Sequence, residues 1–166
     1  MRDKNSTRYQ IYQILSRLEH EGNLTEEKKI PQHRNVSVHT HSVHVALTSC
    51  RIADRLHLDV DRDSLIRGAL LHDYFLYNWR EYDRSHRLHG FRHPGIALRN
   101  AKNDYSINEV EEDIIKKHMF PLTPLPPATR EAWIVTLADK ICAVKELVGR
   151  SSKYSFSGVL PEEEAV

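Results

Sequence analysis

Leu-Ile-Arg-Gly-Ala-Leu-Leu-His-Asp, residues 65–73, is the stretch of the sequence that decides the fold. Its dense apolar run predicts a central, buried helix, and its end places an imidazole next to a carboxylate. An ionised aspartate in such surroundings is costly unless something pairs with it. A divalent cation is one such partner, and a His72–Asp73 hydrogen bond that closes the helix is another. This dipeptide alone leaves both readings open.

Apolar residues at helical spacing predict further helices on both sides of this stretch. The first includes Ile11, Leu15 and Leu18 and stops at Gly22. We expect helices over residues 6–21, 41–56, 65–77, from 93 onward, 106–118 and 128–147.

Capping signals mark several of the expected helix ends. Asp61 and Asp63 are candidate N-caps for the helix over 65–77, and Pro94 suits the first turn of the next one. Ser-Ile-Asn-Glu, residues 106–109, reads as a capping box. Gly149 is the expected stop of the last helix.

The segments between these helices read as loops. Residues 23–38 form a charged connector with a short helix around 25–29, residues 78–92 are rich in Arg and His, and residues 121–127 hold four prolines. Only residues 35–39 hint at a strand. We therefore predict an all-α bundle in a single domain over 1–166, with its core at about 38–148. Residues 1–30 form an N-terminal helical extension and 150–166 a loose polar tail.

The composition excludes several classes of protein. Over 166 residues the net charge is +1, so there is no basic excess that would indicate binding to a nucleic-acid duplex. The sequence has no long apolar run, so we expect neither a signal peptide nor a membrane span. Cys50 and Cys142 lie in apolar, helix-like contexts without a C-x-x-C spacing and are expected to be buried, reduced thiols. We expect a cytoplasmic protein.

The unusual feature of the composition is histidine, with eleven residues. Imidazole is the commonest protein metal ligand. Asp139 lies within an apolar helical stripe, where a carboxylate needs a partner. Helical bundles build metal sites from side chains on different helices. The candidates occur in the order His41, His72, Asp73, His93, His118, Asp139.

Three motifs resemble the H…HD…D signature of the HD-domain phosphohydrolases. They are His41-Ser-x-x-Val-Ala, His72-Asp73 and Ala138-Asp139, and the resemblance covers about residues 38–147. It implies a right-handed bundle of about five core helices, here with an added N-terminal helix.

Two further histidines resemble those of the HD subset that binds two metals, which includes HD-GYP-like phosphodiesterases and a few oxygenases. They are His93, followed by Pro, and His118. The resemblance implies that Asp73 bridges the two metals and that His93 and His118 hold the second one. The first metal would be held by His41, His72, Asp73 and Asp139.

Neighbouring histidines compete for these roles. Among His39, His41 and His44, the family pattern favours the residue directly before Ser-x-x-Val-Ala. Between His89 and His93, the family pattern and the following proline favour His93. The histidines expected to be exposed and without function are His20, His33 and His57.

The sequence departs from the HD-GYP pattern at two places. Residues 74–77 are Tyr-Phe-Leu-Tyr where that group has a Gly-Lys, and His118 is followed by Met-Phe-Pro instead of Gly-Tyr-Pro. Cyclic-dinucleotide specificity is therefore not expected. Residues 72–80 instead resemble a bacterial branch of HD hydrolases.

The activity implied is hydrolysis of a small phosphomonoester or phosphodiester, with a nucleotide as one candidate, by a metal-bridging hydroxide. One or two Fe, Mn, Zn or Ni ions suit the mixed ligands better than Mg. We assign catalytic roles to His72, Asp73 and Lys140. The candidate phosphate-binding residues are Arg80, Arg84, Arg87, Arg92, Lys117 and Lys140.

Two alternatives remain open at this point. The same ligand order resembles mixed-valent di-iron oxygenases such as myo-inositol oxygenase, which use dioxygen. A non-catalytic module that binds a nucleotide or a structural metal is the other. Helical bundles of this size often pair, so a homodimer is a further expectation.

Overall fold

The structure is a computed structural model that describes residues 4–32, 35–78 and 89–149. Within these ranges the chain is helical, and its only β-type pairing is an isolated bridge between Pro31 and Ser37. The predicted all-α class is therefore confirmed. The elements are α1 (Lys4–Glu21), the 3-10 helix η1 (Leu24–Lys29), α2 (Val38–Arg55), α3 (Arg62–Leu71), α4 (His89–Asp104), α5 (Glu109–Lys117) and α6 (Arg130–Leu147).

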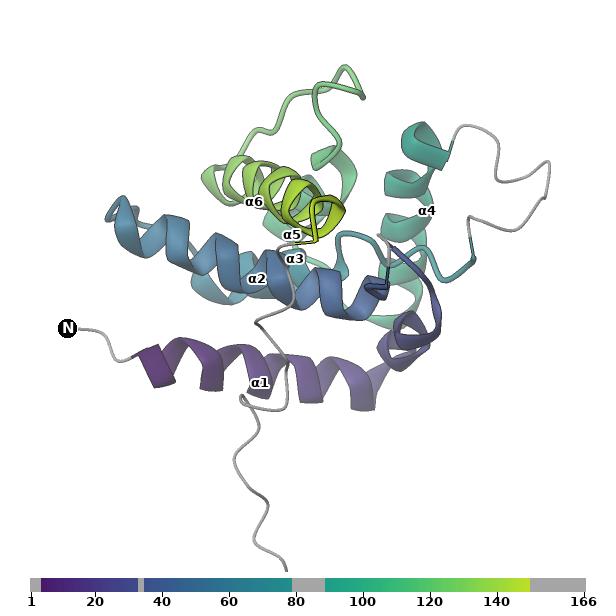
Figure 1. Cartoon of the computed structure of the whole chain (residues 1–166), viewed down its shortest axis with the longest axis horizontal. Coiled ribbons are helices and arrows are strands. Elements are labelled where there is room, and N and C mark those ends of the chain that lie inside the picture. Colours follow the sequence, from purple (N-terminus) through teal and green to yellow (C-terminus); the bar gives the residue numbers. More distant parts are fainter. Residues whose placement is uncertain (1–3, 33–34, 79–88, 150–166) are drawn as a thin grey trace, which may run out of the picture.

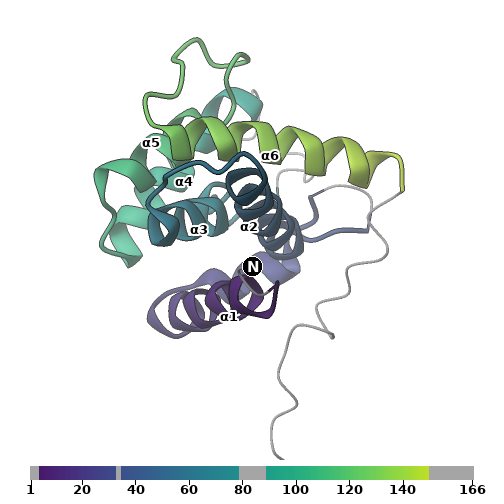
Figure 2. The ribbon, with the colours of Figure 1, turned by 90° about the vertical axis from the view of Figure 1, so that its left-hand side faces the viewer.

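Helices α2 and α3 form the centre of the bundle (Figure 1). They contact each other, α1 on one side and α6 on the other, and α5 packs against both α3 and α6. Figure 2 shows α1 and α6 on opposite sides of this central pair. One core joins these helices, and each contributes a side chain that is fully buried: Leu18, Val45, Leu70, Ile114 and Val135.

Side-chain caps fix where the two central helices begin. Helix α2 starts after Ser37, whose side chain accepts a hydrogen bond from the backbone N–H of Thr40. Helix α3 starts after Asp61, whose carboxylate accepts from the backbone N–H of Ser64, as one of the two candidate caps predicted. Residues 35–37 make only the isolated bridge, and the chain is helical from Val38.

Helix α3 ends at Leu71, six residues before the predicted end. The aromatic run that follows turns away, and Leu76 adopts a positive φ of 56°. The Asn100 side chain of α4 donates hydrogen bonds to the backbone carbonyls of Tyr74 (3.1 Å) and Phe75 (3.2 Å). Tertiary contacts thus satisfy carbonyls that a longer helix would have used, which periodicity cannot reveal.

Helices α2 and α3 begin three residues before their predicted starts, and the predicted starts of α4 and α5 were also wrong. Helix α4 already includes His89, so Pro94 lies inside it, where it has no N–H for the carbonyl four residues earlier. The capping box of α5 lies two residues after the predicted one. The Asn108 side chain accepts from the N–H of Glu111, whose carboxylate accepts from the N–H of Asn108.

The beginning and end of α6 follow from local chemistry. Thr129 caps its start, and the Asp113 carboxylate accepts from the N–H groups of Ala128 and Thr129. Gly149, at a φ of 71°, follows its end as predicted.

Two expectations from composition are consistent with the described residues. Cys50 and Cys142 are buried free thiols. None of the described helices combines the length and apolarity needed to cross a membrane.

Gly68 allows α3 and α5 to approach closely, which gives a first prediction. A Cβ at this position would lie 2.4 Å from Ile114 Cδ1 and 3.1 Å from Ile114 Cβ. We expect Gly68→Ala to destabilise the protein by about 1–3 kcal/mol in urea unfolding, because the overpacked helices must separate.

The matched control is Gly95→Ala, in the exposed part of α4, where an added Cβ meets nothing within 4 Å. Here the gain in helix propensity should leave stability unchanged or raise it by about 0.5–1 kcal/mol. Equal effects of the two substitutions would contradict the close approach of α3 and α5.

Candidate metal centre

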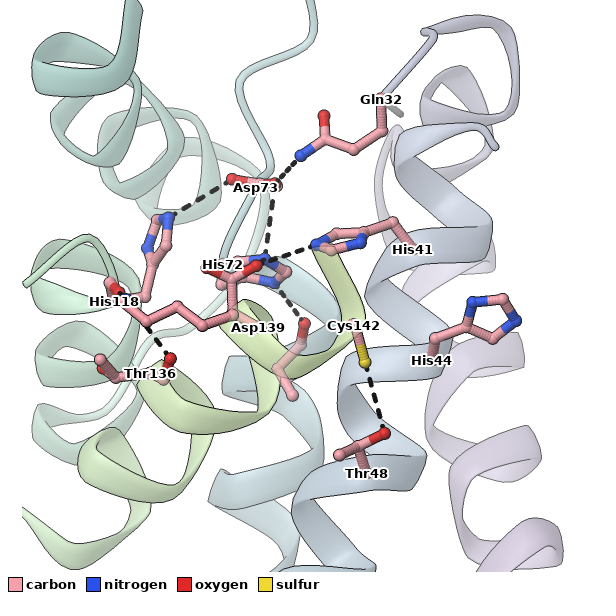
Figure 3. Close-up of polar contacts among 12 residues, drawn as sticks. Gln32, His41, His44, Thr48, His72, Asp73, His118, Thr136, Asp139 and Cys142 are labelled. Carbon is pink, nitrogen blue, oxygen red and sulfur yellow. Dashed lines mark hydrogen bonds and ion pairs between the residues drawn. The ribbon is translucent and has the colours of Figure 1, made fainter. Parts of the chain in front are cut away.

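The six predicted ligand residues come together at one buried point. His41 lies in α2, His93 in α4 and Asp139 in α6, while His72 and His118 directly follow the ends of α3 and α5. Asp73 follows His72. Each of the six is at most 9% exposed. Figure 3 shows five of these side chains pointing toward one another, from helices far apart in the sequence.

Three of these residues form a first group of ligand atoms. Asp139 Oδ1 lies 3.0 Å from His41 Nε2 and 3.7 Å from His72 Nε2. Asp73 Oδ2 adds a fourth atom, 3.4 Å from His72 Nε2. These are the residues predicted to hold the first metal.

The other oxygen of Asp73 belongs to a second group. Asp73 Oδ1 lies 3.1 Å from His93 Nε2 and 3.4 Å from His118 Nε2. The two imidazole Nε2 atoms are themselves 2.9 Å apart. Asp73 therefore places one carboxylate oxygen beside each group, as expected of a bridging carboxylate. His72 also has a ligand atom within 4.8 Å of ligand atoms of both Asp73 and His118.

Each imidazole turns its Nδ1 away from the centre, toward an acceptor on its own or another helix. His72, His93 and His118 contact the backbone carbonyls of residues 69, 89 and 115 at 2.7–3.0 Å. His41 Nδ1 contacts the carboxylate of Glu146 at 2.9 Å. Since carbonyls and carboxylates only accept, each of these Nδ1 atoms carries a proton, and Nε2 is the atom that would bind a metal ion once any proton on it has been displaced.

The donor set fits a metal ion on two further observations. With Nδ1 protonated, the neutral rings of His93 and His118 would direct two lone pairs at each other across 2.9 Å, an arrangement that a cation stabilises. His72 Nε2 and Asp73 Oδ1 are buried and make no hydrogen bond to any of the residues that the structure describes. Imidazole and carboxylate together suit transition metals.

The electrostatics of the cluster also favour a cation. Burial would raise the pKa of Asp73 and of Asp139, but the neighbouring histidines outweigh it and hold both pKa values below the usual range. Burial would lower the pKa of His41, yet Asp139 and Glu146 raise it well above its ordinary value. The same balance brings the pKa of Glu146 down to about 2. The centre thus holds ionised carboxylates that need cationic partners, a role that a metal ion can take in place of the protons on the histidines.

Two residues at the centre were missed by the sequence analysis. Gln32 Nε2 donates a 2.7 Å hydrogen bond to Asp73 Oδ2, and nothing in its loop sequence marked it. Glu146 contacts His41, and here a signal existed. It follows Asp139 by seven residues, about two helical turns, so both lie on one face of α6.

A pocket of about 620 Å³ opens onto this centre. Lys140 lines it, and its Nζ donates to the carbonyls of His118 (3.1 Å) and Thr136 (3.4 Å). Burial lowers the pKa of Lys140, while Asp139 acts in the opposite direction. The described walls of the pocket are Gln32, Asp73, His89, Gly90, His93, His118, Met119, Pro121, Leu122, Asp139, Lys140 and Ala143.

The structure does not bring the other described phosphate candidates into this pocket. Lys117 forms a 2.6 Å ion pair with Asp113, the residue that holds the start of α6. Arg92 is exposed on α4 outside the described walls. The remaining candidates, Arg80, Arg84 and Arg87, lie outside the described residues.

The competing histidines take other places. His39 contacts Glu19 at 2.9 Å and His44 contacts Glu146 at 3.1 Å, so His41 is the one of the three that enters the cluster. His89 stacks on His93 at the pocket wall. The histidines with exposed side chains are His20 and His57, as predicted, while His33 lies outside the described residues.

Glu27, in η1, gives a prediction about pH. It is fully buried, and both carboxylate oxygens lack a hydrogen-bond partner among the described residues. Burial, followed by the charge of Asp73, raises its pKa well above the ordinary value. The unfolded chain releases the Glu27 proton above about pH 4.3, whereas the folded state keeps it up to its raised pKa. The free energy of unfolding therefore falls as the pH rises from about 4.3 toward that raised pKa.

Glu27→Gln should remove this dependence. In thermal unfolding with chelator, the stability of the variant relative to the wild type should increase as the pH rises from 5 to 8, by at most about 1.4 kcal/mol per pH unit. Glu26→Gln, an exposed neighbour in η1, is the control and should keep the wild-type pH profile. Parallel profiles for Glu27→Gln and the wild type would contradict the prediction.

Comparison with known proteins agrees with the geometry. The family model described as HD domain matches residues 38–144. The chain is 32% identical over 126 residues to Ribonuclease Y of Pseudothermotoga lettingae, an alignment that covers 76% of this chain and 22% of that protein. No solved structure matches significantly. Because the matched residues make up well over half of the chain and include the whole ligand cluster, the protein belongs to the HD domain family.

Proposed function

We propose that this protein is a metal-dependent phosphohydrolase that cleaves a small phosphomonoester or phosphodiester at a centre of two metal ions. The observation that carries the proposal is the position of Asp73. Its Oδ2 faces His72 and its Oδ1 faces His93 and His118, so one carboxylate joins two sets of ligands. Two-metal centres of this kind occur in many phosphatases and nucleases.

The six ligand residues would be shared between the two metal ions. His41, His72, Asp73 and Asp139 would hold one ion, and Asp73, His93 and His118 the other. Such ions supply Lewis-acid stabilisation of phosphoryl oxygens and activation of water near neutral pH. Gln32 fixes one oxygen of Asp73 through its 2.7 Å hydrogen bond and so orients the shared carboxylate.

Lys140 is the residue that we propose to bind the phosphate. Its ammonium lies at the pocket wall next to a ligand in the sequence, held by two backbone carbonyls. A cation held in place beside the reacting group stabilises the negative charge that develops on the phosphoryl oxygens. The carbonyl contacts position this charge without neutralising it.

The size of the pocket is compatible with a substrate as large as a nucleotide. A volume of about 620 Å³ lies within the usual range of small-molecule sites. Its lining includes the apolar residues Met119, Leu122 and Ala143, which suit the uncharged part of a substrate. The similarity to Ribonuclease Y, whose name describes cleavage of RNA, supports including phosphodiesters.

An assay with a model monoester, a model diester and nucleotides tests the proposal. Protein stripped of metal would be supplied in turn with Mn, Fe, Ni, Zn and Mg and assayed on p-nitrophenyl phosphate, bis-p-nitrophenyl phosphate and a set of nucleotides. Hydrolysis that depends on a transition metal supports the proposal. Metal binding with oxygen uptake and no hydrolysis would favour the oxygenase alternative, and metal binding with neither activity would favour a regulatory module.

The shared carboxylate predicts different metal contents for two variants. His118→Asn removes a ligand from the second group alone and should reduce the metal content from about two ions per chain to about one. Asp73→Asn weakens both groups and should remove both ions at the same free-metal concentration. Both should lower hydrolysis at least about 100-fold. Elemental analysis after equilibrium dialysis gives the metal content.

His57→Asn is the matched control. His57 is exposed and has a φ of 52°, a conformation that Asn tolerates well. It should keep the metal content and the activity of the wild type. Equal metal loss in His118→Asn and Asp73→Asn would contradict the arrangement around Asp73.

A further inference from the structure

Glu146 connects the metal centre to a second histidine of α2. This carboxylate is 2% exposed and lies between two imidazoles. Its Oε2 accepts a hydrogen bond from His41 Nδ1 at 2.9 Å, and its Oε1 accepts from His44 Nδ1 at 3.1 Å. The two histidines are three residues apart and so lie on one side of the helix.

This contact distinguishes His41 from the other imidazoles of the centre. The Nδ1 atoms of His72, His93 and His118 contact neutral backbone carbonyls, whereas Nδ1 of His41 contacts a carboxylate. A charged acceptor makes a stronger hydrogen bond and increases the electron density at Nε2. His41 is thereby made the more basic ligand.

His44 fixes the other end of the carboxylate. Its ring is outside the ligand cluster and lines a separate cavity of about 520 Å³ between α1 and α2. Because each oxygen of Glu146 is bound by a different ring, rotation of the carboxylate would break the buried hydrogen bond to His41 and the partly buried one to His44. The pair therefore holds the ring of His41 in one orientation.

We propose that Glu146 and His44 are positioning residues that set the affinity of the first metal position through His41. The proposal rests on the metal centre of the proposed function but not on its hydrolytic activity. Neither residue would touch the metal or the substrate. Loss of such partners behind a metal-binding histidine typically weakens metal binding about 10–100-fold.

Isothermal titration of Mn²⁺ into protein stripped of metal tests this. Glu146→Gln keeps the size of the side chain but removes its charge and one of its two acceptors. We expect the first binding step to weaken about 10–100-fold, and the step assigned to His93 and His118 to change less than about threefold. His44→Asn should weaken the first step by a smaller factor, and in the Glu146→Gln background it should add almost nothing.

Glu19→Gln provides a matched control. Glu19 contacts His39 at 2.9 Å, lines the same cavity as His44, and forms a similar Glu–His pair that does not reach a metal ligand. Its Mn²⁺ affinity should stay within about twofold of the wild type. Unfolding temperatures measured in chelator separate loss of affinity from loss of folding, and His44→Asn decides the question if Glu146→Gln does not fold.

The outcomes separate the two proposals. Unchanged affinity in a folded Glu146→Gln, or in His44→Asn when only that variant folds, overturns the inference. An equal loss of Mn²⁺ affinity in Glu19→Gln overturns it as well, because the effect would then come from a general loosening of the fold. A wild type that binds Mn²⁺ without hydrolysing any phosphoester overturns the proposed function and leaves this test intact. A wild type that binds no Mn²⁺ overturns both.

Discussion

The structure depends on the burial of one carboxylate, that of Asp73. It is 3% exposed, and the neighbouring imidazoles keep it ionised. A buried charge is tolerated only when partners surround it. Here they come from separate parts of the chain: the amide of Gln32 and the imidazoles of His72, His93 and His118. The packing of α3, α4 and α5 around this point therefore serves the core and the site together.

Helix ends provide two of these partners. His72 and His118 are the C-caps of α3 and α5, and each directs Nδ1 at the carbonyl three residues earlier. A carbonyl in the last turn of a helix lacks an intrahelical donor, so this contact satisfies it and fixes the tautomer of the ring. The local termination of the helix thus aims Nε2 at the centre, without a special loop.

The polar centre buries several charged side chains inside a small bundle. The carboxylates of Asp73, Asp139 and Glu146 lie among imidazoles, and the charge of Asp73 reaches the buried Glu27 and helps to raise its pKa. In such a site, binding of a cation also contributes to the stability of the fold, because the unfolded chain does not present the same ligands. Affinity for metal and stability of the bundle are therefore expected to vary together.

Much of this protein was determined by local sequence. Apolar spacing, Pro94 and a capping signal indicated the six α-helices of the described residues, and Asp61 and Gly149 mark two helix ends, because these signals act over a few residues. The short motifs around His41, His72 and Asp139, taken in order, identified the family. Where tertiary contacts compete with local signals, the sequence misleads. The Asn100 side chain of α4 binds the carbonyls of Tyr74 and Phe75, beyond the end of α3. The error at α5 is of another kind, because Asn108 and Glu111 form a local capping box two residues after the predicted one.

The surroundings of the ligands were decided only in three dimensions. Gln32 meets Asp73 across 41 residues, and Glu146 meets His41 across 105, distances over which no periodicity extends. The sequence alone named the atoms that could bind a metal. The family resemblance already implied that Asp73 is the bridging carboxylate. Which ring nitrogen faces inward and which residue holds it there follow from the packing of helices, because these depend on relative positions that no local pattern encodes.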